Sequence, residues 1–249
     1  MRFAFREGTI QNILHDEGYP TAKAYITCED RDILGGEFMV MDFMRGKTMY
    51  EATTIDLIPT KLAEAHARLH GINPSRFIEK LKQSSVPQFS YDGTVYVDSW
   101  ISSSNIDWLK PGLKWIMENQ PTERRSAICH GDFHPNNILV EEGEVSAVLD
   151  WSSGRIGEPE SDVAATRTIL TCYSPSVRPW IDYVAFTDEY LDLYTKHERL
   201  DLERVRYYEA ARSLKLLEAL EAGFVSEMPG VRERFLSRFY DVSGLRLSK

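Results

Sequence analysis

Apolar positions in residues 5–17 recur at nearly helical spacing, and Gly18 followed by Pro20 ends the pattern. We therefore predict one amphipathic helix there. Two apolar stretches typical of strands follow, at residues 22–28 and 37–43, with a charged segment and two glycines between them. They predict an antiparallel pair of strands.

From residue 47 onward the apolar period becomes helical. Residues 57–69 predict a helix that ends near Gly71, and residues 114–119 predict a short one. Residues 84–112 mix Ser, Gly, Asp and Pro with scattered aromatic residues, which is typical of either a substrate-facing insertion or a surface lid. Further helices are expected at Asp162–Thr171, Trp180–Lys196, Leu202–Gly223 and Val231–Tyr240.

A β-hairpin is predicted in the middle of the chain. Two short apolar runs, residues 138–140 and 145–149, flank a Glu-Gly pair at 142–143 that suits a tight turn. If the turn is centred within that pair, the numbers of opposed residues sum to 285. This register places Asn137 opposite Val148.

The same register places Asp150 opposite Pro135, beside the loop that contains Asp132 and Asn137. Opposed residues in a hairpin lie only about 5 Å apart. Two carboxylates and a carboxamide then converge on one small volume. Oxygen ligands of this kind suit a hard cation such as Mg²⁺, which is usually held together with substrate phosphates.

The order of these three residues is the one that phosphoryl transfer needs. In such sites one Asp accepts the proton of the attacking hydroxyl, while an Asn and a second Asp hold metal against the nucleotide phosphates. We therefore predict Asp132 as the catalytic base and Asn137 and Asp150 as metal ligands. Turn formation and capping are the structural alternatives for these residues.

Four segments carry a family resemblance. His130–Leu139 resembles the catalytic loop of the aminoglycoside phosphotransferase family, the small-molecule relatives of protein kinases. Leu149–Trp151 resembles the metal-binding segment of that family. Gly157–Pro159 and Asp162–Ala164 resemble the helix that braces it, and the order and spacing of all four segments agree with the family.

The resemblance implies an α+β, protein-kinase-like two-lobe fold. Residues 1–46 would form a truncated N-terminal β lobe and the hinge, and residues 47–249 a mainly helical C-terminal lobe. It also implies the reaction, which is transfer of the γ-phosphoryl group of ATP or GTP to a hydroxyl of a small molecule. Mg²⁺ would be the metal cofactor.

More site residues are assigned by the resemblance alone. Met41, Asp42 and Met44 look like the hinge that binds the adenine base, with Met41 at the back wall. The Asp42 carbonyl and the Met44 amide would face the base. Glu7 looks like the helix glutamate of the N-terminal lobe.

Support of the catalytic loop is expected from His130 and Asp162. Asp162 also opens a predicted helix, where a carboxylate is favoured. We interpret His134 as a structural residue too. The alternation of His130, Asp132 and His134 could also suggest a metallohydrolase, but that interpretation leaves the spacing of the Asn and the second Asp as a coincidence.

A complete kinase-like lobe has a Gly-rich loop over the phosphates and a strand lysine that pairs with the helix glutamate. Nothing before Glu7 matches either, and Lys23 and Lys47 fall on other predicted elements. Three explanations compete: a late start codon or truncated gene product, a working variant that uses other cations, or a degenerate member acting as a non-catalytic binding module. The intact motifs favour the first.

The net charge of −9 argues against a nucleic-acid partner and for a neutral or cationic small molecule. Glu158 and Glu160 could bind a cationic substrate, although such residues more often form a solvated rim. The aminoglycoside phosphotransferase family, which the motifs resemble, also contains kinases for choline-like, sugar and amino-alcohol substrates. The identity of the substrate, the choice between ATP and GTP, and the oligomeric state therefore stay open.

No secretory signal and no apolar run of about 18 residues is present, and the three cysteines lie far apart. We expect a cytoplasmic protein with no membrane partner. His66 and His70 stand one helical turn apart and could bind zinc, but Ala67 occupies the position where the His-Glu-x-x-His pattern has its glutamate. We interpret both as ordinary helix residues.

Overall fold

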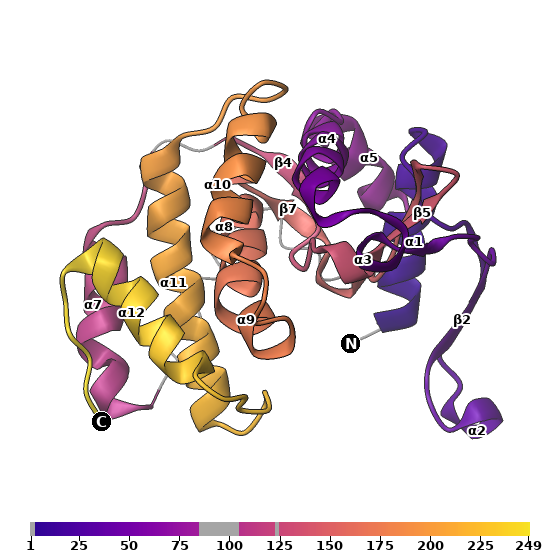
Figure 1. The fold of residues 1–249 in the computed structure, drawn as a ribbon. Coiled ribbons are helices and arrows are strands. Elements are labelled where there is room, and N and C mark those ends of the chain that lie inside the picture. Colours follow the sequence, from indigo (N-terminus) through magenta and orange to yellow (C-terminus); the bar gives the residue numbers. More distant parts are fainter. Residues whose placement is uncertain (1–2, 85–104, 123–124) are drawn as a thin grey trace.

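The computed structural model describes residues 3–84, 105–122 and 125–249. Most of the predicted insertion therefore lies outside the described residues, and its role stays a prediction. In the described part, small antiparallel sheets lie with some of the helices on one side, and the remaining helices pack together on the other (Figure 1). None of the described helices has the length and apolar character needed to cross a membrane.

The first elements are a helix and two strands that flank a short helix: α1 (Phe3–Asp16), β1 (Ala24–Cys28), α2 (Arg31–Leu34) and β2 (Phe38–Met41). The strands pair in antiparallel fashion, so the predicted helix and strand pair are confirmed. Gly8 lets α1 lie close to the sheet, because a Cβ at Gly8 would stand 2.9 Å from Cγ2 of Thr27.

Strands β1 and β2 with α2 at their tip form an arm on the side of the molecule opposite α11 and α12 (Figure 1). Within the described residues this sheet has two strands, so each has one edge without a neighbouring strand. Large apolar side chains are exposed along the arm: Tyr25, Ile26, Ile33, Leu34, Val40 and Phe43.

The middle of the chain forms short and long elements in turn: β3 (Lys47–Thr48), α3 (Met49–Ala52), α4 (Ile58–His70), α5 (Pro74–Gln83) and α7 (Lys110–Glu118). Ile58 and Leu62 belong to the buried face of α4, and Gly71 ends the helix as predicted. Helix α5 was not predicted, because its buried face rests on only two residues, Phe77 and Leu81.

Four short strands surround the predicted site: β4 (Ala127–Cys129), β5 (Ile138–Glu141), β6 (Glu144–Val148) and β7 (Arg155–Gly157). The predicted hairpin is β5 with β6, and β3 adds to it on the other edge of β5. Strand β4, which precedes the loop of Asp132, pairs with β7, which follows Asp150. The two sheets therefore bring both halves of the predicted site to one place.

The predicted register of the hairpin is correct only next to the turn. Beyond a bulge it shifts by one residue, so Ile138, rather than Asn137, lies opposite Val148. Ser146 is the additional residue in β6, and its hydroxyl donates to the carbonyl of Arg45 at 2.8 Å. Periodicity alone does not reveal an inserted strand residue of this kind.

The C-terminal part is helical, and the four helices predicted there are confirmed: α8 (Pro159–Thr168), α10 (Tyr183–Tyr194), α11 (Leu202–Glu221) and α12 (Val231–Ser243). A short helix that was not predicted, α9 (Ser174–Val177), lies between α8 and α10. A π-helical turn, Ile169–Tyr173, joins α8 to α9. Helix α11 packs between α8 and α12, and α10 packs on α4. One apolar core lies around α1, α4, α10 and the hairpin, and a second lies among α7, α11 and α12.

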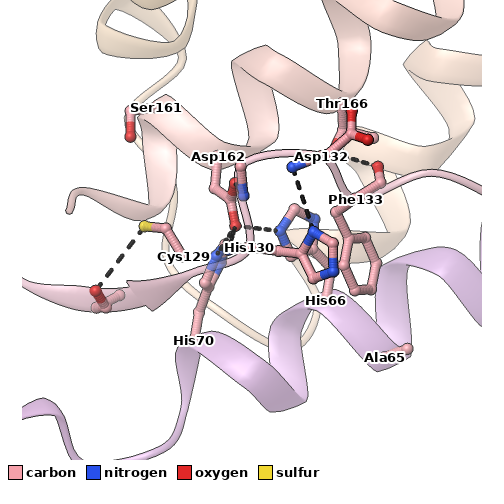
Figure 2. Close-up of polar contacts among 12 residues, drawn as sticks. Ala65, His66, His70, Cys129, His130, Asp132, Phe133, Ser161, Asp162 and Thr166 are labelled. Carbon is pink, nitrogen blue, oxygen red and sulfur yellow. Dashed lines mark hydrogen bonds and ion pairs between the residues drawn. The ribbon is translucent and has the colours of Figure 1, made fainter. Parts of the chain in front are cut away.

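A single carboxylate ties these helices to the loop before β5. Asp162 in α8 is fully buried; its Oδ1 accepts from the N–H of Gly131 and its Oδ2 from that of His130, both at 2.6 Å (Figure 2). Nε2 of His66 lies 3.0 Å and Nε2 of His70 lies 3.3 Å from Oδ2. The loop, α4 and α8 thus meet at this carboxylate.

The two histidines extend the network into α10. Because an ionised carboxylate only accepts, Nε2 of each imidazole donates to Asp162, and in the neutral ring Nδ1 then accepts a hydrogen bond. Its donor is the hydroxyl of Tyr190 for His66, at 2.7 Å, and that of Tyr194 for His70, at 2.6 Å. The interpretation of His66 and His70 as ordinary helix residues is therefore wrong. Their ring nitrogens lie close enough to Asp162 for a metal ion, but hydrogen bonds already account for this arrangement.

The charges in the network follow from burial and from hydrogen bonding. Burial by itself raises the pKa of the Asp162 carboxyl, but hydrogen bonds from His66 and His70 outweigh it and hold that pKa well below its ordinary value. Burial, with a smaller contribution from His70, lowers the pKa of His66 to about 4. At neutral pH one negative charge on Asp162 therefore faces four N–H donors.

Asp162→Asn tests the importance of this carboxylate. The variant puts an amide N–H₂ where the site requires an acceptor, so we expect the free energy of unfolding to fall by about 3 kcal/mol or more. Urea unfolding measures it. Asp188→Asn is the matched control, because Asp188 pairs with Arg167 but is 61% exposed, and it should cost less than about 1 kcal/mol. Equal losses in the two variants would contradict the assignment.

The lowered pKa of His66 predicts that the protein loses stability in acid. In the unfolded chain its imidazole binds a proton below about pH 6.5, whereas the pKa of the buried ring is about 4. The stability that the neutral His66 ring contributes is fully present above its pKa in the unfolded chain. This stability is lost as the pH falls from there toward the pKa of His66 in the folded protein. Unfolding midpoints at neutral and acidic pH measure this loss. The unfolding midpoint of His66→Gln should be lower than that of the wild type at neutral pH but should fall less on acidification. An equal fall in the two proteins would argue against the proton linkage.

Candidate active site

Asp132, Asn137 and Asp150 lie at the open end of the β5–β6 hairpin. The first two belong to the loop between β4 and β5, which ends in a 3-10 turn, Pro135–Asn137. Asp150 follows β6. The N–H of Leu149 donates to the carbonyl of Asn137 at 2.8 Å, so the two halves of the site are joined through their backbones.

Asn137 is oriented by Asp132. Its Nδ2 donates to the backbone carbonyl of Asp132 at 3.0 Å and to Oδ2 of the same residue at 3.2 Å. Because the amide nitrogen of Asn137 donates hydrogen bonds to Asp132, the amide oxygen is the atom of this side chain that can bind a cation. An amide oxygen and a carboxylate are the kinds of ligand that suit Mg²⁺, and binding of a metal by Asn137 and Asp150 stays a prediction.

The Asp132 carboxylate is only partly buried and lies 3.4 Å from Nε2 of His134. Burial by itself raises the pKa of Asp132, but the hydrogen bond and the charge of His134, with smaller contributions from His130 and Arg212, together outweigh it. The pKa of Asp132 therefore lies below its ordinary value, and the group is an ionised acceptor at neutral pH. The contact of His134 with Asp132 was missed, because the sequence shows only that the two residues are near each other.

His130 joins the catalytic-loop side of the site to the Asp150 side. Its Nδ1 accepts from the N–H of Asp132 at 3.2 Å, and its Nε2 donates to the carbonyl of Leu149 at 2.9 Å. The ring packs against Trp151, with 4.5 Å between ring centroids. Burial lowers the pKa of His130, which favours the neutral ring that can donate and accept at the same time.

Asp150 has a left-handed backbone with φ of 60°, which is uncommon for a residue other than glycine. Its Oδ1 accepts from the N–H of Ser152 at 3.3 Å and from the hydroxyl at 2.5 Å, and so caps the 3-10 turn Trp151–Ser153. The loop between β4 and β5 approaches this turn at Gly131. A Cβ at Gly131 would lie 2.9 Å from the carbonyl oxygen of Ser153, so a side chain does not fit there.

Glu7 reaches the same turn from α1. Its Oε1 accepts from the N–H of Trp151 at 3.0 Å. Burial, together with the charge of Asp150, raises the pKa of Glu7. The structure thus brings Glu7 next to the predicted metal segment, although its role toward a nucleotide stays a prediction.

Met41, Asp42 and Met44, the predicted hinge, lie at the end of β2 and just beyond it. The carboxylate of Asp42 accepts from the N–H of Lys23 at 3.1 Å and from the hydroxyl of Tyr25 at 2.8 Å. Its side chain is therefore fixed to β1. Met41 is exposed and Met44 is half-buried, and their contact with adenine also stays a prediction.

Glu158 and Glu160 are buried, with 6% and 4% exposure, so the expected solvated rim is wrong. Glu158 lies 3.5 Å from the guanidinium of Arg204, and Glu160 accepts from the N–H of Asp201 at 3.3 Å. Both carboxylates make contacts within the protein. These contacts argue against a direct role of either residue in binding a cationic substrate.

Comparison with known proteins gives the same family that the motifs indicate. A model of the "Phosphotransferase enzyme family" matches residues 3–208. Acyl-CoA dehydrogenase family member 11 of Homo sapiens is 29% identical over 199 residues, which cover 74% of this chain and 25% of that protein. The uncharacterized protein YcbJ of Bacillus subtilis (strain 168) is 29% identical over 114 residues, covering 44% and 37%. The chain spans about a quarter of the length of the acyl-CoA dehydrogenase family members.

Solved structures share the fold at low sequence identity. A thermostable mutant of aminoglycoside phosphotransferase APH(4)-Ia, in ternary complex with AMP-PNP and hygromycin B, has a TM-score of 0.65 and 17% identity, covering 98% of this chain and 84% of that one. Amicoumacin kinase, in complex with AMP-PNP and Ca²⁺, has a TM-score of 0.63 and 16% identity, covering 97% and 78%. An ethanolamine kinase of Plasmodium vivax has a TM-score of 0.61 and 14% identity, covering 95% and 71%.

These likenesses confirm the predicted α+β, protein-kinase-like fold. The family model covers more than half of the chain, including both segments that hold Asp132, Asn137 and Asp150. The chain therefore belongs to the phosphotransferase enzyme family.

Proposed function

We propose that this protein is a Mg²⁺-dependent phosphotransferase that moves the γ-phosphoryl group of ATP or GTP to a hydroxyl of a small molecule. One observation carries the proposal. The amide nitrogen of Asn137 binds Asp132 while its backbone carbonyl binds the N–H of Leu149, directly before Asp150. An ionised base and an oxygen donor pair are thereby held in one rigid arrangement, which suits catalysis by positioning.

Each residue has a role that follows from its contacts. Asp132, kept ionised with help from His134, would orient the attacking hydroxyl and accept its proton. Asn137 and Asp150 would hold Mg²⁺, which when bound would neutralise charge on the nucleotide phosphates. His130 keeps the two sides in register through its bonds to Asp132 and Leu149.

The nucleotide base would bind at the hinge. Because the carboxylate of Asp42 is engaged by Lys23 and Tyr25, the backbone carbonyl of Asp42 and the amide of Met44 are the groups we assign to the adenine. Glu7 would complete the nucleotide side through the turn that follows Asp150.

For the substrate we propose a small hydroxyl compound, neutral or cationic, in keeping with the net charge of −9. The similar structures include kinases named for amicoumacin and ethanolamine and one bound to hygromycin B. Amino alcohols and aminoglycosides are therefore the first compounds to screen for consumption of ATP. The dehydrogenase name of the longer relatives is not transferred, since the match spans about a quarter of their length.

The first test is the unfolding midpoint of the protein with ATP, with and without Mg²⁺. Binding to the native state must raise the midpoint, by about 2.7 kcal/mol of added stability at 100 times the Kd. We expect Asp150→Asn to lose the Mg²⁺-dependent rise. Asp132→Ala should keep that rise but show no turnover in a coupled ATP assay.

Two outcomes would count against the proposal. Equal residual turnover in Asp150→Asn and Asp132→Ala would refute the separate roles of metal ligand and base. Absence of any Mg²⁺-dependent shift in the wild-type chain would favour the alternative that the sequence leaves open, a truncated or degenerate binding module.

His134→Ala tests the environment of Asp132. The variant removes the hydrogen bond that lowers the pKa of Asp132 and leaves the effect of burial, so that pKa should rise. Activity is lost as the pH falls through this pKa, so the acid limb of the pH–rate profile should move to higher pH in the variant than in the wild type. His134→Gln retains a donor and should shift it less. An unchanged acid limb in His134→Ala would show that His134 does not act on the base.

A further inference from the structure

Arg6 in α1 binds the turn that follows Asp150. Its guanidinium donates to the carbonyl of Ser152 at 2.7 Å and to the carbonyl of Gly154. A planar guanidinium presents several N–H groups in a fixed geometry, so one side chain can bind two carbonyls at once. The first helix is thereby joined to the segment that carries the predicted metal ligand.

The left-handed backbone of Asp150 is the feature that needs this support. Such a conformation is unfavourable for a residue other than glycine and persists only where the surroundings fix it. Ser152 binds the Asp150 side chain from within the turn, while Arg6 and Glu7 bind the backbone of the turn from α1. Helix α1 itself is fixed by fully buried residues such as Ile10.

We propose that Arg6 is a positioning residue of the phosphotransferase site. By binding the carbonyls of Ser152 and Gly154 it holds the carboxylate of Asp150 in the orientation that binds Mg²⁺. This inference rests on the proposed function. Arg6 acts through Asp150 and does not itself touch the reacting groups.

A competing role for Arg6 is direct contact with the nucleotide phosphates, as a cation in place of the strand lysine. The two roles differ in what they require. Contact with phosphate needs a positive charge and acts on nucleotide binding with or without metal. Holding the turn needs the two N–H···O=C hydrogen bonds and affects only the part of nucleotide binding that depends on Mg²⁺.

The test measures ADP binding by calorimetry at increasing Mg²⁺ in the wild type, Arg6→Met and Arg6→Lys. Arg76→Met is the matched control, because Arg76 is 64% exposed and pairs with Glu17 away from the turn. We expect Arg6→Met to raise about tenfold the Mg²⁺ concentration at which the Mg²⁺-dependent gain in ADP affinity is half complete. Arg6→Lys should bring that concentration only part of the way back to the wild-type value. Metal-free affinity for ADP should stay unchanged in both.

An unchanged Mg²⁺ dependence in Arg6→Met overturns the proposal. A loss of metal-free ADP binding that Arg6→Lys restores overturns it as well, because it marks contact with phosphate. If the wild type binds no ADP at all, the proposed function fails, and hydrogen exchange decides on Arg6 alone. Amides of residues 151–154 that exchange about tenfold faster in Arg6→Met, with β5 still protected, support its hold on the turn, and equal rates overturn it.

Discussion

The buried carboxylate of Asp162 is the point on which the site depends. It binds both histidines of α4 and the backbone N–H groups at the start of the loop that contains Asp132, and tyrosines of α10 complete the arrangement. A buried charge is tolerable only when hydrogen bonds satisfy it. Here the loop that contains Asp132 supplies two of these hydrogen bonds. The same contacts therefore fix the conformation of the loop and offset the cost of burying the charge.

A second level of support comes from α1 and acts on the other half of the site. Asp162 fixes the loop of Asp132 and Asn137 from the helical side, whereas Arg6 and Glu7 contact the turn after Asp150 from the N-terminal side. His130 connects the two through Asp132 and Leu149. The three site residues are exposed or half-buried, yet each is attached to a group that packing has already fixed.

Much of this could be predicted from the sequence, for reasons that are local. Asp132 and Asn137 precede a single hairpin and Asp150 follows it, and the helices of the C-terminal part have regular apolar faces. The shift of register at Ser146 could not be predicted, because a bulge leaves no trace in the alternation of apolar residues. The partnership of His66 and His70 with Asp162 was missed because it joins residues 92 to 96 positions apart. Glu158 and Glu160 were expected at the surface because their partners in the folded chain lie more than 40 positions downstream.

The Asp162 network also sets an order of events during synthesis. Its members are spread from His66 in α4 to Tyr194 in α10. A chain that grows from its N-terminus makes the catalytic loop well before α10. When the loop and Asp162 have been synthesised, the tyrosines that bind the two histidines have not yet been added to the chain. The nascent site therefore cannot reach its final hydrogen bonding until about sixty further residues after the loop have been translated.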